Sequence, residues 1–97
     1  MRFEWDERKN RANNKKHGVG FEDASFIFND RLILSKLDDR FAYGEERWLS
    51  IGSASGLAIL TVGHTSIEDK SGEEIVRIIS ARKANRAERQ RYHRDDR

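Results

Sequence analysis

The sequence predicts an α+β fold, with N-terminal helices packed on an antiparallel β-sheet of about four strands and a basic helix at the C-terminus. Three observations predict it. The spacing of apolar residues changes from helical to alternating after residues 29–30. The connections between the expected strands are short, so neighbouring strands must run antiparallel. Residues 57–62, LAILTV, are apolar on both faces, as in a central strand that helices cover.

The N-terminal part is expected to form one short strand and two helices. Residues 3–5 alternate as in a strand, and Asp6 is a candidate N-cap of the helix that follows. That helix should end at Gly18, which can adopt the left-handed C′ conformation. His17 falls in its last turn, where a cation is favourable, although the sequence leaves a functional role for it open. Residues 21–28 have apolar positions at helical spacing, which predicts a second, short helix.

Four strands should follow these helices. They are expected at residues 32–37, 47–52, 57–64 and 74–80, with turns at residues 53–56 and 66–72. A basic helix is then expected to complete a single domain spanning residues 1–97. We find no internal repeat and no low-complexity linker in the chain.

The composition excludes several classes of function. The chain has no cysteine, so disulfides, thiolate metal sites and cysteine catalysis are excluded. No apolar run is long enough to span a membrane, and we expect a cytoplasmic protein without membrane contact. The three histidines have neither HxH nor HExxH spacing, so the sequence indicates neither a metal site nor a cofactor.

Charge is distributed unevenly along the chain. Residues 1–76 hold 11 basic and 14 acidic side chains, a net charge of −3. Residues 77–97 hold 8 basic and 3 acidic side chains, a net charge of +5. Such an asymmetry suggests a segment that binds a polyanion, although a solvated terminal helix would have the same composition.

The expected C-terminal helix contains the strongest candidate phosphate site. Ser80 is a candidate N-cap, which would place Arg82 and Lys83 in the first turn, where helices usually carry acids. Free N–H groups, a hydroxyl and two cations at a helix N-terminus suit a phosphate. Arg82, Arg86 and Arg89 would then form one cationic edge at helical spacing. A solvated face whose arginines pair with acids of the body is the alternative.

Three further residues are candidates for a site on the sheet. Arg77 stands in an otherwise apolar strand, where it either pairs with an acid such as Glu45 or Glu46 or lines a cleft, and Arg47 raises the same question. His64 ends the central strand and is a candidate general acid or base. A structural histidine bonded to a turn is the alternative. Without His64, proton transfer would fall to Glu46 or to a lysine of shifted pKa.

Three runs of the sequence stand out: FEWDERKNRANNKKHGVGFEDA, EERWLSIG, and an HT pair followed by RIISARKANRAERQRY. They resemble the BrnT family of toxins from type II toxin–antitoxin systems. The resemblance covers nearly the whole chain and is most specific in the WD…N…KHG…F and ISAR…ER patterns. The positions that match the family pattern are His17 with Gly18, Arg47, His64, Arg77, Ser80, Arg82 and Arg89.

The resemblance implies a RelE-like fold and a metal-independent endoribonuclease that arrests translation. It also implies neutralisation by a BrnA-type ribbon-helix-helix antitoxin in a dimer of heterodimers, with operator DNA bound only through the antitoxin. The RNA 2′-hydroxyl would attack the adjacent phosphate, so that positioning and charge stabilisation dominate catalysis. We assign Arg82 and Arg77 to transition-state stabilisation and His64 to acid–base transfer. The expected RNA-binding residues are Arg47, Ser80, Lys83, Arg86 and Arg89. A non-catalytic module that binds nucleic acid or protein through the basic helix is the alternative.

Overall fold

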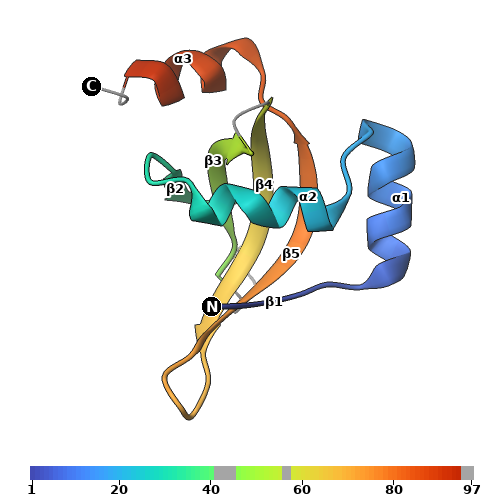
Figure 1. The fold of residues 1–97 in the computed structure, drawn as a ribbon, viewed down its shortest axis with the longest axis vertical. Helices are drawn as coiled ribbons and strands as arrows, with labels where there is room; N and C mark the ends of the chain where they lie inside the picture. The colour runs from blue at the N-terminus through green and yellow to red at the C-terminus, as the bar shows by residue number, and fades with distance from the viewer. Residues whose placement is uncertain (41–45, 56–57, 95–97) are drawn as a thin grey trace.

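The structure, a computed structural model, describes residues 1–40, 46–55 and 58–94 and has the predicted α+β architecture (Figure 1). In chain order the elements are β1 (Arg2–Glu4), α1 (Glu7–His17), α2 (Phe21–Ser25), the 3-10 helix η1 (Phe26–Asn29), β2 (Leu34–Leu37), β3 (Trp48–Ala54), β4 (Ala58–Glu68), β5 (Glu74–Lys83) and α3 (Arg86–Arg94). No helix in this described part is both long and apolar enough to cross a membrane.

The strands form one sheet in the order β1-β5-β4-β3-β2. The four strands β2 to β5 are antiparallel neighbours, as predicted. The prediction of a sheet of about four antiparallel strands was nevertheless wrong, because β1 joins as a fifth strand, parallel to β5, with Phe3 opposite Val76. Short connections fix the relative direction of consecutive strands. β1 and β5 are separated by most of the chain, so no turn dictates how they pair.

Both predicted turns lie at hairpins, with shifted boundaries. β4 continues to Glu68, so the β4–β5 turn spans residues 69–73 and includes Gly72 at a φ of 85°. In that turn the Asp69 carboxylate accepts hydrogen bonds from the backbone N–H groups of Ser71 and Glu73. The earlier turn follows the end of β3 at Ala54, and its predicted Gly56 lies outside the described residues.

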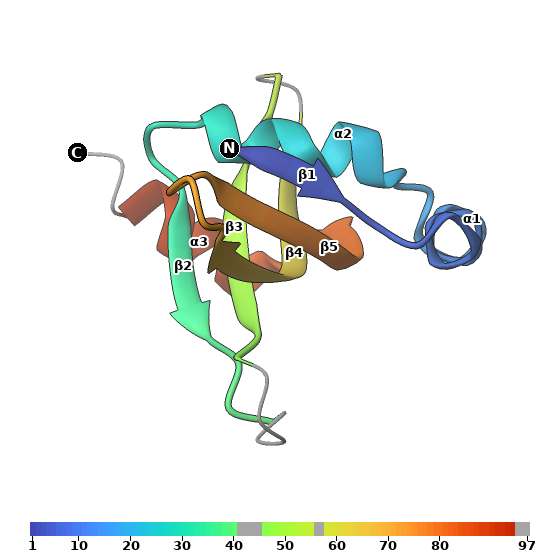
Figure 2. The same cartoon turned by 90° about the horizontal axis from the view of Figure 1, so that it is seen from below.

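Helix α2 and η1 cover one face of the sheet (Figure 2). The predicted helix over residues 21–28 is confirmed, with its last part tightened to a 3-10 helix. Phe21, Ala24 and Ile27 are fully buried at this interface. Full burial of such apolar side chains stabilises the fold by roughly 1.5–3 kcal/mol for each of the larger ones. The sheet residues in the same core are Leu60, Val62, Val76, Ile78 and Ala81.

Helix α1 lies at the edge of the sheet and contributes no buried side chain. Its predicted ends are confirmed: the Asp6 carboxylate accepts from the N–H groups of Arg8 and Lys9, and Gly18 adopts a φ of 72°. Two asparagines attach it to the body. The side-chain Oδ1 of Asn10 accepts from Phe21 N, 2.9 Å away, and the Asn13 side chain bonds the backbone of both β5 and the α1–α2 linker.

The junction of β5 and α3 corrects the prediction of one long C-terminal helix. β5 continues to Lys83, and α3 begins only at Arg86. Ser80 is therefore not an N-cap, and Arg82 belongs to a strand. The long β4 explains the difference, because it provides backbone partners for the end of β5, with Thr61 opposite Arg82. Cross-strand pairing thus outweighs the helix propensity of these residues.

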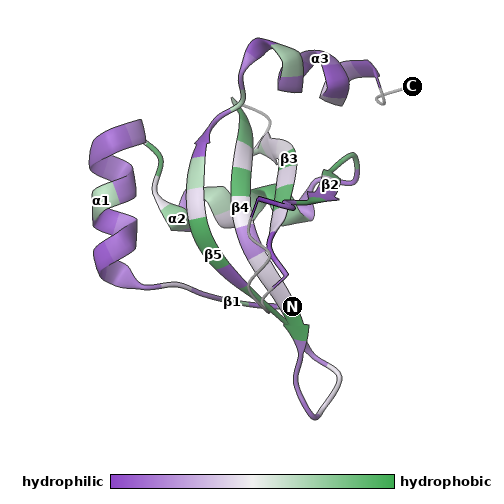
Figure 3. Ribbon diagram, turned by 180° about the vertical axis from the view of Figure 1, so that it is seen from behind, coloured by the Kyte–Doolittle hydropathy of each residue, from purple (hydrophilic) through white to green (hydrophobic). Residues whose placement is uncertain are grey.

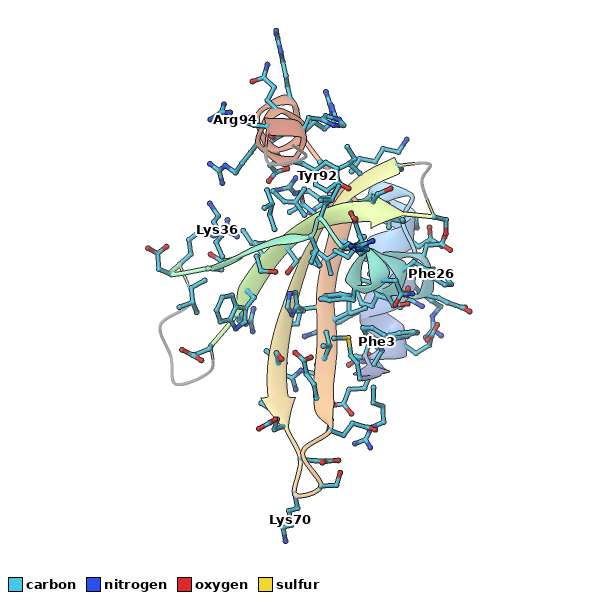
Figure 4. All side chains as sticks on the ribbon, turned by 60° about the vertical axis from the view of Figure 1, so that its left-hand side comes forward. Phe3, Phe26, Lys36, Lys70, Tyr92 and Arg94 are labelled. Carbon is cyan, nitrogen blue, oxygen red and sulfur yellow. The ribbon has the colours of Figure 1, made fainter. Side chains whose placement is uncertain are left out.

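The true N-terminus of α3 has a reciprocal capping box. The Asn85 side-chain oxygen accepts from Glu88 N at 2.9 Å, and Glu88 Oε1 accepts from Asn85 N at 2.8 Å. An acid in the first turn also suits the helix dipole, so the reversed charge pattern expected from the sequence does not exist. Further along, the Tyr92 hydroxyl donates to Asp30 Oδ2 at 2.5 Å, and Tyr92 lies between α3 and the end of the sheet (Figure 4).

Candidate functional site

The sheet surface that faces away from α2 carries Thr61, Gly63 and Thr65 of β4, and we call it the open face. Side chains on adjacent antiparallel strands that lie opposite each other share a face. The β5 residues opposite these three are Arg82, Ser80 and Arg77. The structure thus brings three predicted site residues together, on a strand and not on a helix N-terminus.

Gly63 makes room for the hydroxyl of Ser80. A Cβ atom at position 63 would lie only 2.6 Å from Ser80 Oγ, well inside contact distance. Because glycine has no side chain, the Ser80 hydroxyl can sit against the backbone of β4. Ser80 itself is exposed on this strand.

Arg82 forms a bidentate ion pair with Glu88. Its Nη1 and Nη2 lie 2.7 Å and 3.0 Å from the two carboxylate oxygens, and Thr61 Oγ1 also donates to Glu88 at 2.9 Å. The Arg82 hydrogen bonds are the main reason that the pKa of Glu88 is lowered to about 2. A phosphate presents its oxygens much as a carboxylate does. The guanidinium of Arg82 is therefore preorganised for an anion, and Glu88 occupies that place.

An apolar groove of about 290 Å³ lies beside this ion pair, between the open face and α3. Leu34, Leu49 and Ile51 provide apolar lining, while Lys36 and Arg91 bring positive charge to it. Its remaining lining residues are Ser35, Thr61, Asn85, Ala87 and Glu88. An apolar floor with cations nearby suits a ligand that has a flat apolar ring and a phosphate.

The other predicted RNA-binding residues are dispersed. Arg86 and Arg89 lie on α3 beside Gln90 and His93, away from the groove, and Arg89 Nη1 donates to Ala84 O at 2.7 Å. The expected edge that joined them to Arg82 is therefore wrong, since only Arg86 and Arg89 belong to a helix.

Lys83 and Arg47 are the two remaining predicted RNA-binding residues. Lys83 is opposite Leu60 of the α2-covered face, so it does not belong to the open face. Arg47 immediately precedes β3, and its backbone carbonyl accepts from Asp38 N at 2.7 Å. The predicted pairing of Arg77 with Glu45 falls outside the described residues.

His64 lies on the covered face, opposite to Arg82. It is buried, with 5% of its surface exposed, and its ring packs edge-on against Phe28 at a centroid distance of 4.8 Å. Its Nδ1 lies 3.3 Å from Thr65 O and its Nε2 lies 2.7 Å from Ser50 Oγ. Burial lowers the pKa of His64. This environment favours a neutral, structural histidine.

The sequence interpretation missed Glu88 and Thr61. The spacing Asn85-x-x-Glu88 is a capping-box pattern, so it could have located both the helix start and the acid beside Arg82. His17 lies at the exposed C-terminal end of α1, as its predicted place in the last turn requires. Within the described ranges, no three His, Asp or Glu side chains are close enough together to hold a metal ion.

The fold and the site define a small α+β protein with one sheet face suited to a polyanion. Comparison with known families identifies it further. The chain belongs to the BrnT family, because the family described as "Ribonuclease toxin, BrnT, of type II toxin-antitoxin system" matches residues 5–88. The chain is also similar to the 1.1 Å crystal structure of the Brucella abortus ribonuclease toxin BrnT, at 30% identity and a TM-score of 0.60. That match covers 89% of this chain and 99% of the other. A comparison with curated proteins found no match.

Proposed function

We propose that this protein is a metal-independent endoribonuclease of a RelE-like type, which cleaves RNA on the open face and thereby arrests translation. Membership of a family of ribonuclease toxins supports the reaction class. The observation that carries the proposal is the bidentate Arg82–Glu88 pair beside the groove. A guanidinium fork in that place can exchange its carboxylate for the phosphate that is to be cleaved.

The cleavage step needs no group beyond the RNA and the protein. The 2′-oxygen attacks the adjacent phosphorus as its proton is removed, the bond from phosphorus to the 5′-oxygen breaks, and that oxygen leaves with a proton. The products are a 2′,3′-cyclic phosphate and a 5′-hydroxyl. Arg82 and Arg77 would stabilise the negative charge on the phosphate oxygens, and Ser80 would donate a hydrogen bond. A base would lie in the groove, with Lys36 and Arg91 available to its phosphates.

Glu88 is better placed for proton transfer than His64, which lies on the covered face. In the free protein the Glu88 carboxylate is a weak base, since Arg82 lowers its pKa to about 2. When Arg82 turns to a phosphate, the main cause of that shift is removed, and the pKa of Glu88 rises toward its usual value of 4.5. Substrate binding would thus make the carboxylate more basic when a base is required.

Cleavage in the presence of EDTA tests the proposal. A long, unstructured RNA is incubated with the purified protein, with the Arg82→Ala variant, and with Arg31→Ala as a control for an exposed arginine in a turn. We expect fragments with 2′,3′-cyclic phosphate ends from the wild type and the control, and none from Arg82→Ala. Intact RNA with retained, salt-sensitive binding would favour the alternative, a non-catalytic module that binds nucleic acid or protein.

We also propose that a BrnA-type ribbon-helix-helix antitoxin neutralises the protein in a dimer of heterodimers, and that operator DNA is bound only through the antitoxin. A type II toxin–antitoxin system implies a protein antitoxin, which supports this assignment. The complex of the two purified proteins should have the mass of two copies of each. It should not cleave RNA, and the toxin alone should not bind operator DNA specifically.

A further inference from the structure

Helix α1 carries a set of cations that the proposed site does not use. Five of its 11 residues are basic, all five are exposed, and Glu7 is its one acid. None of the five forms an ion pair or a side-chain hydrogen bond with another residue in the described ranges, whereas Arg2, Arg40 and Arg82 do. The five residues are Arg8, Lys9, Arg11, Lys15 and Lys16.

Three of these cations lie on the side of α1 that faces away from the body, and two lie on its flanks. Asn10 and Asn13 bind the body, which fixes the inner side of the helix. At about 100° per residue, Arg8, Arg11 and Lys15 fall on the opposite side, and the other two cations fall on the flanks of the helix. The only apolar residue of the helix is Ala12, and Figure 3 shows that α1 is hydrophilic along almost its whole length. We call the exposed surface that carries all five cations, Arg8, Lys9, Arg11, Lys15 and Lys16, the outer face of α1.

Helix α1 lies next to the candidate site, across the edge of β5. β1 covers that edge only at residues 75–77, and α1 lies along the part that follows (Figure 1). Asn13 fixes this position, because its Nδ2 donates to Ala81 O at 2.7 Å and its Oδ1 accepts from Ala81 N at 3.2 Å. The next residue on β5 is Arg82. A strand of RNA that leaves Arg82 over this edge therefore meets α1.

We propose that the outer face of α1 binds the sugar–phosphate backbone of RNA outside the cleavage site, as a second and sequence-independent contact. This inference rests on the proposed function, since the RNA is the substrate of the open face. Protein interfaces are poor in lysine at their centres and need apolar or aromatic anchors, and α1 offers neither. Helices that lie on membranes bury an apolar face, which α1 also lacks. Unpaired cations alone suit phosphates.

The size of the surface fits a short stretch of backbone. Arg8 and Lys15 are seven residues apart, so the cationic stripe between them is about 10 Å long. Binding of this kind releases counterions, and the affinity for single strands falls with salt at a slope of about 0.7 per phosphate contact. The second contact should therefore make affinity depend more steeply on salt, with little dependence on sequence.

The test measures the affinity of a fluorescein-labelled single-stranded RNA of about 20 nucleotides, longer than one compact binding site would cover. All proteins carry Arg82→Ala so that the RNA stays intact. The variant Arg11→Gln/Lys15→Gln removes two charges from α1, and Arg31→Gln/Lys70→Gln removes two exposed charges elsewhere. Lys70 is at the tip of the β4–β5 hairpin (Figure 4). Thermal unfolding by circular dichroism confirms that each variant is folded.

We expect the α1 variant to lose about tenfold in affinity at low salt, with a salt slope smaller by about 1.4, while the control changes by less than about twofold. Equal affinities of the α1 variant and the control would overturn the inference. Retained RNA affinity with loss of the antitoxin complex would overturn it too, and would assign α1 to the protein partner. If the protein carrying Arg82 fails to cleave RNA but α1 still controls affinity, the proposed nuclease falls and this inference stands.

Discussion

Helices α1 and α3 are both rich in arginine and lysine, but they are held to the sheet by different interactions. Two neutral asparagines attach α1, and they bond mainly backbone groups of the body. Interactions with carboxylates attach α3: Glu88 pairs with Arg82 of β5, and the Tyr92 hydroxyl donates to the Asp30 carboxylate. As a result α1 keeps its cations free of partners within the described residues, whereas the attachment of α3 uses the arginine beside it.

This comparison shows that the number of cations in a segment does not say what they do. The C-terminal segment, residues 77–97, has the larger net charge, yet its Arg82 forms an internal ion pair with Glu88 and can bind an external anion only by exchanging that partner. The cations of α1 form no ion pair within the described residues. In the proposed function, the oriented guanidinium of Arg82 would serve catalysis, while the cations of α1 would serve non-specific binding, where only charge is needed.

The largest loss of stability should come from Asn13→Ala, which removes the three hydrogen bonds that attach α1 through this side chain. Ala81 N, Ala81 O and Val19 O would lose their partners, and we expect a loss of about 3 kcal/mol in the free energy of unfolding. Urea denaturation measures it. The matched control is Asn14→Ala, an exposed neighbour whose side chain makes no hydrogen bond in the described part, with an expected change below about 0.5 kcal/mol. Equal losses for both variants would mean that Asn13 does not hold α1.

The next effect should come from Glu88→Gln, which breaks the charged attachment of α3. Glu88 has a lower pKa in the folded state, about 2 against a usual 4.5, so its contribution is present above pH 4.5 and disappears as the pH falls toward 2. We expect a loss of about 2 kcal/mol at pH 7, after allowing for screening at Arg82, whose side chain is 40% exposed. Urea denaturation between pH 7 and pH 2 measures it. Glu68→Gln, at an exposed acid, should leave the acid-dependent loss in place.

A smaller effect is expected for Tyr92→Phe, which removes one hydrogen bond between α3 and Asp30, the residue that follows η1. Burial opposes ionisation of Asp30, but hydrogen bonds from Tyr92, Ser53 and Leu32 outweigh it and lower the pKa of Asp30. Because two of these donors remain in the variant, we expect a loss of about 1 kcal/mol and faster amide hydrogen exchange in α3.

A double-mutant cycle with Asp30→Asn checks the origin of this loss. The coupling energy between Tyr92 and Asp30 should be about 1 kcal/mol. A coupling near zero would show that the loss in Tyr92→Phe comes from packing and not from the hydrogen bond.

The smallest effect concerns His64, which belongs to neither attachment and therefore serves as a reference. Its pKa is lowered by burial, so the unfolded chain binds more protons than the folded protein below the usual pKa of 6.5. Stability should therefore decrease as the pH falls below 6.5. Urea denaturation between pH 7.5 and pH 5.5 measures the slope. His64→Gln should flatten it and the exposed His17→Gln should not, while a flat wild-type profile would contradict the assignment.

Local sequence signals predicted much of this fold. Asp6 and Gly18 fix the ends of α1 through backbone geometry that depends only on neighbouring residues. The end of β5 could not be predicted in the same way, because Arg82 is kept in a strand by Thr61 on the adjacent strand. The placement of Arg77, Ser80 and Arg82 on one face likewise depends on an irregularity in the β4–β5 register between Gly63 and His64. Non-local pairing of this kind leaves no signal within a short window of sequence.

The site assignments also depended on whether a residue's position follows from local sequence signals or from non-local contacts. The resemblance to the BrnT family was confirmed, and it includes the arginine that the structure places in the candidate site. Glu88 was overlooked because its role follows from the true start of α3 at Arg86. The interpretation of Ser80 as an N-cap had put the start of that helix too early in the sequence. The sequence places His64 at the end of the central strand, but only the contact with Phe28 of η1 shows that its face of β4 is covered.

The parallel pairing of β1 with β5 affects the order in which the molecule can fold during synthesis. Phe3 is opposite Val76, and Asn13 bonds Ala81, so the first strand and helix find their partners near the end of the chain. A nascent chain leaves the ribosome from its N-terminus, and these segments must wait for β5. Arg82 and Glu88 emerge later still. A nascent chain therefore has no assembled site until β5 and α3 have been synthesised, because both contribute to the groove beside Arg82 or to Arg82 itself.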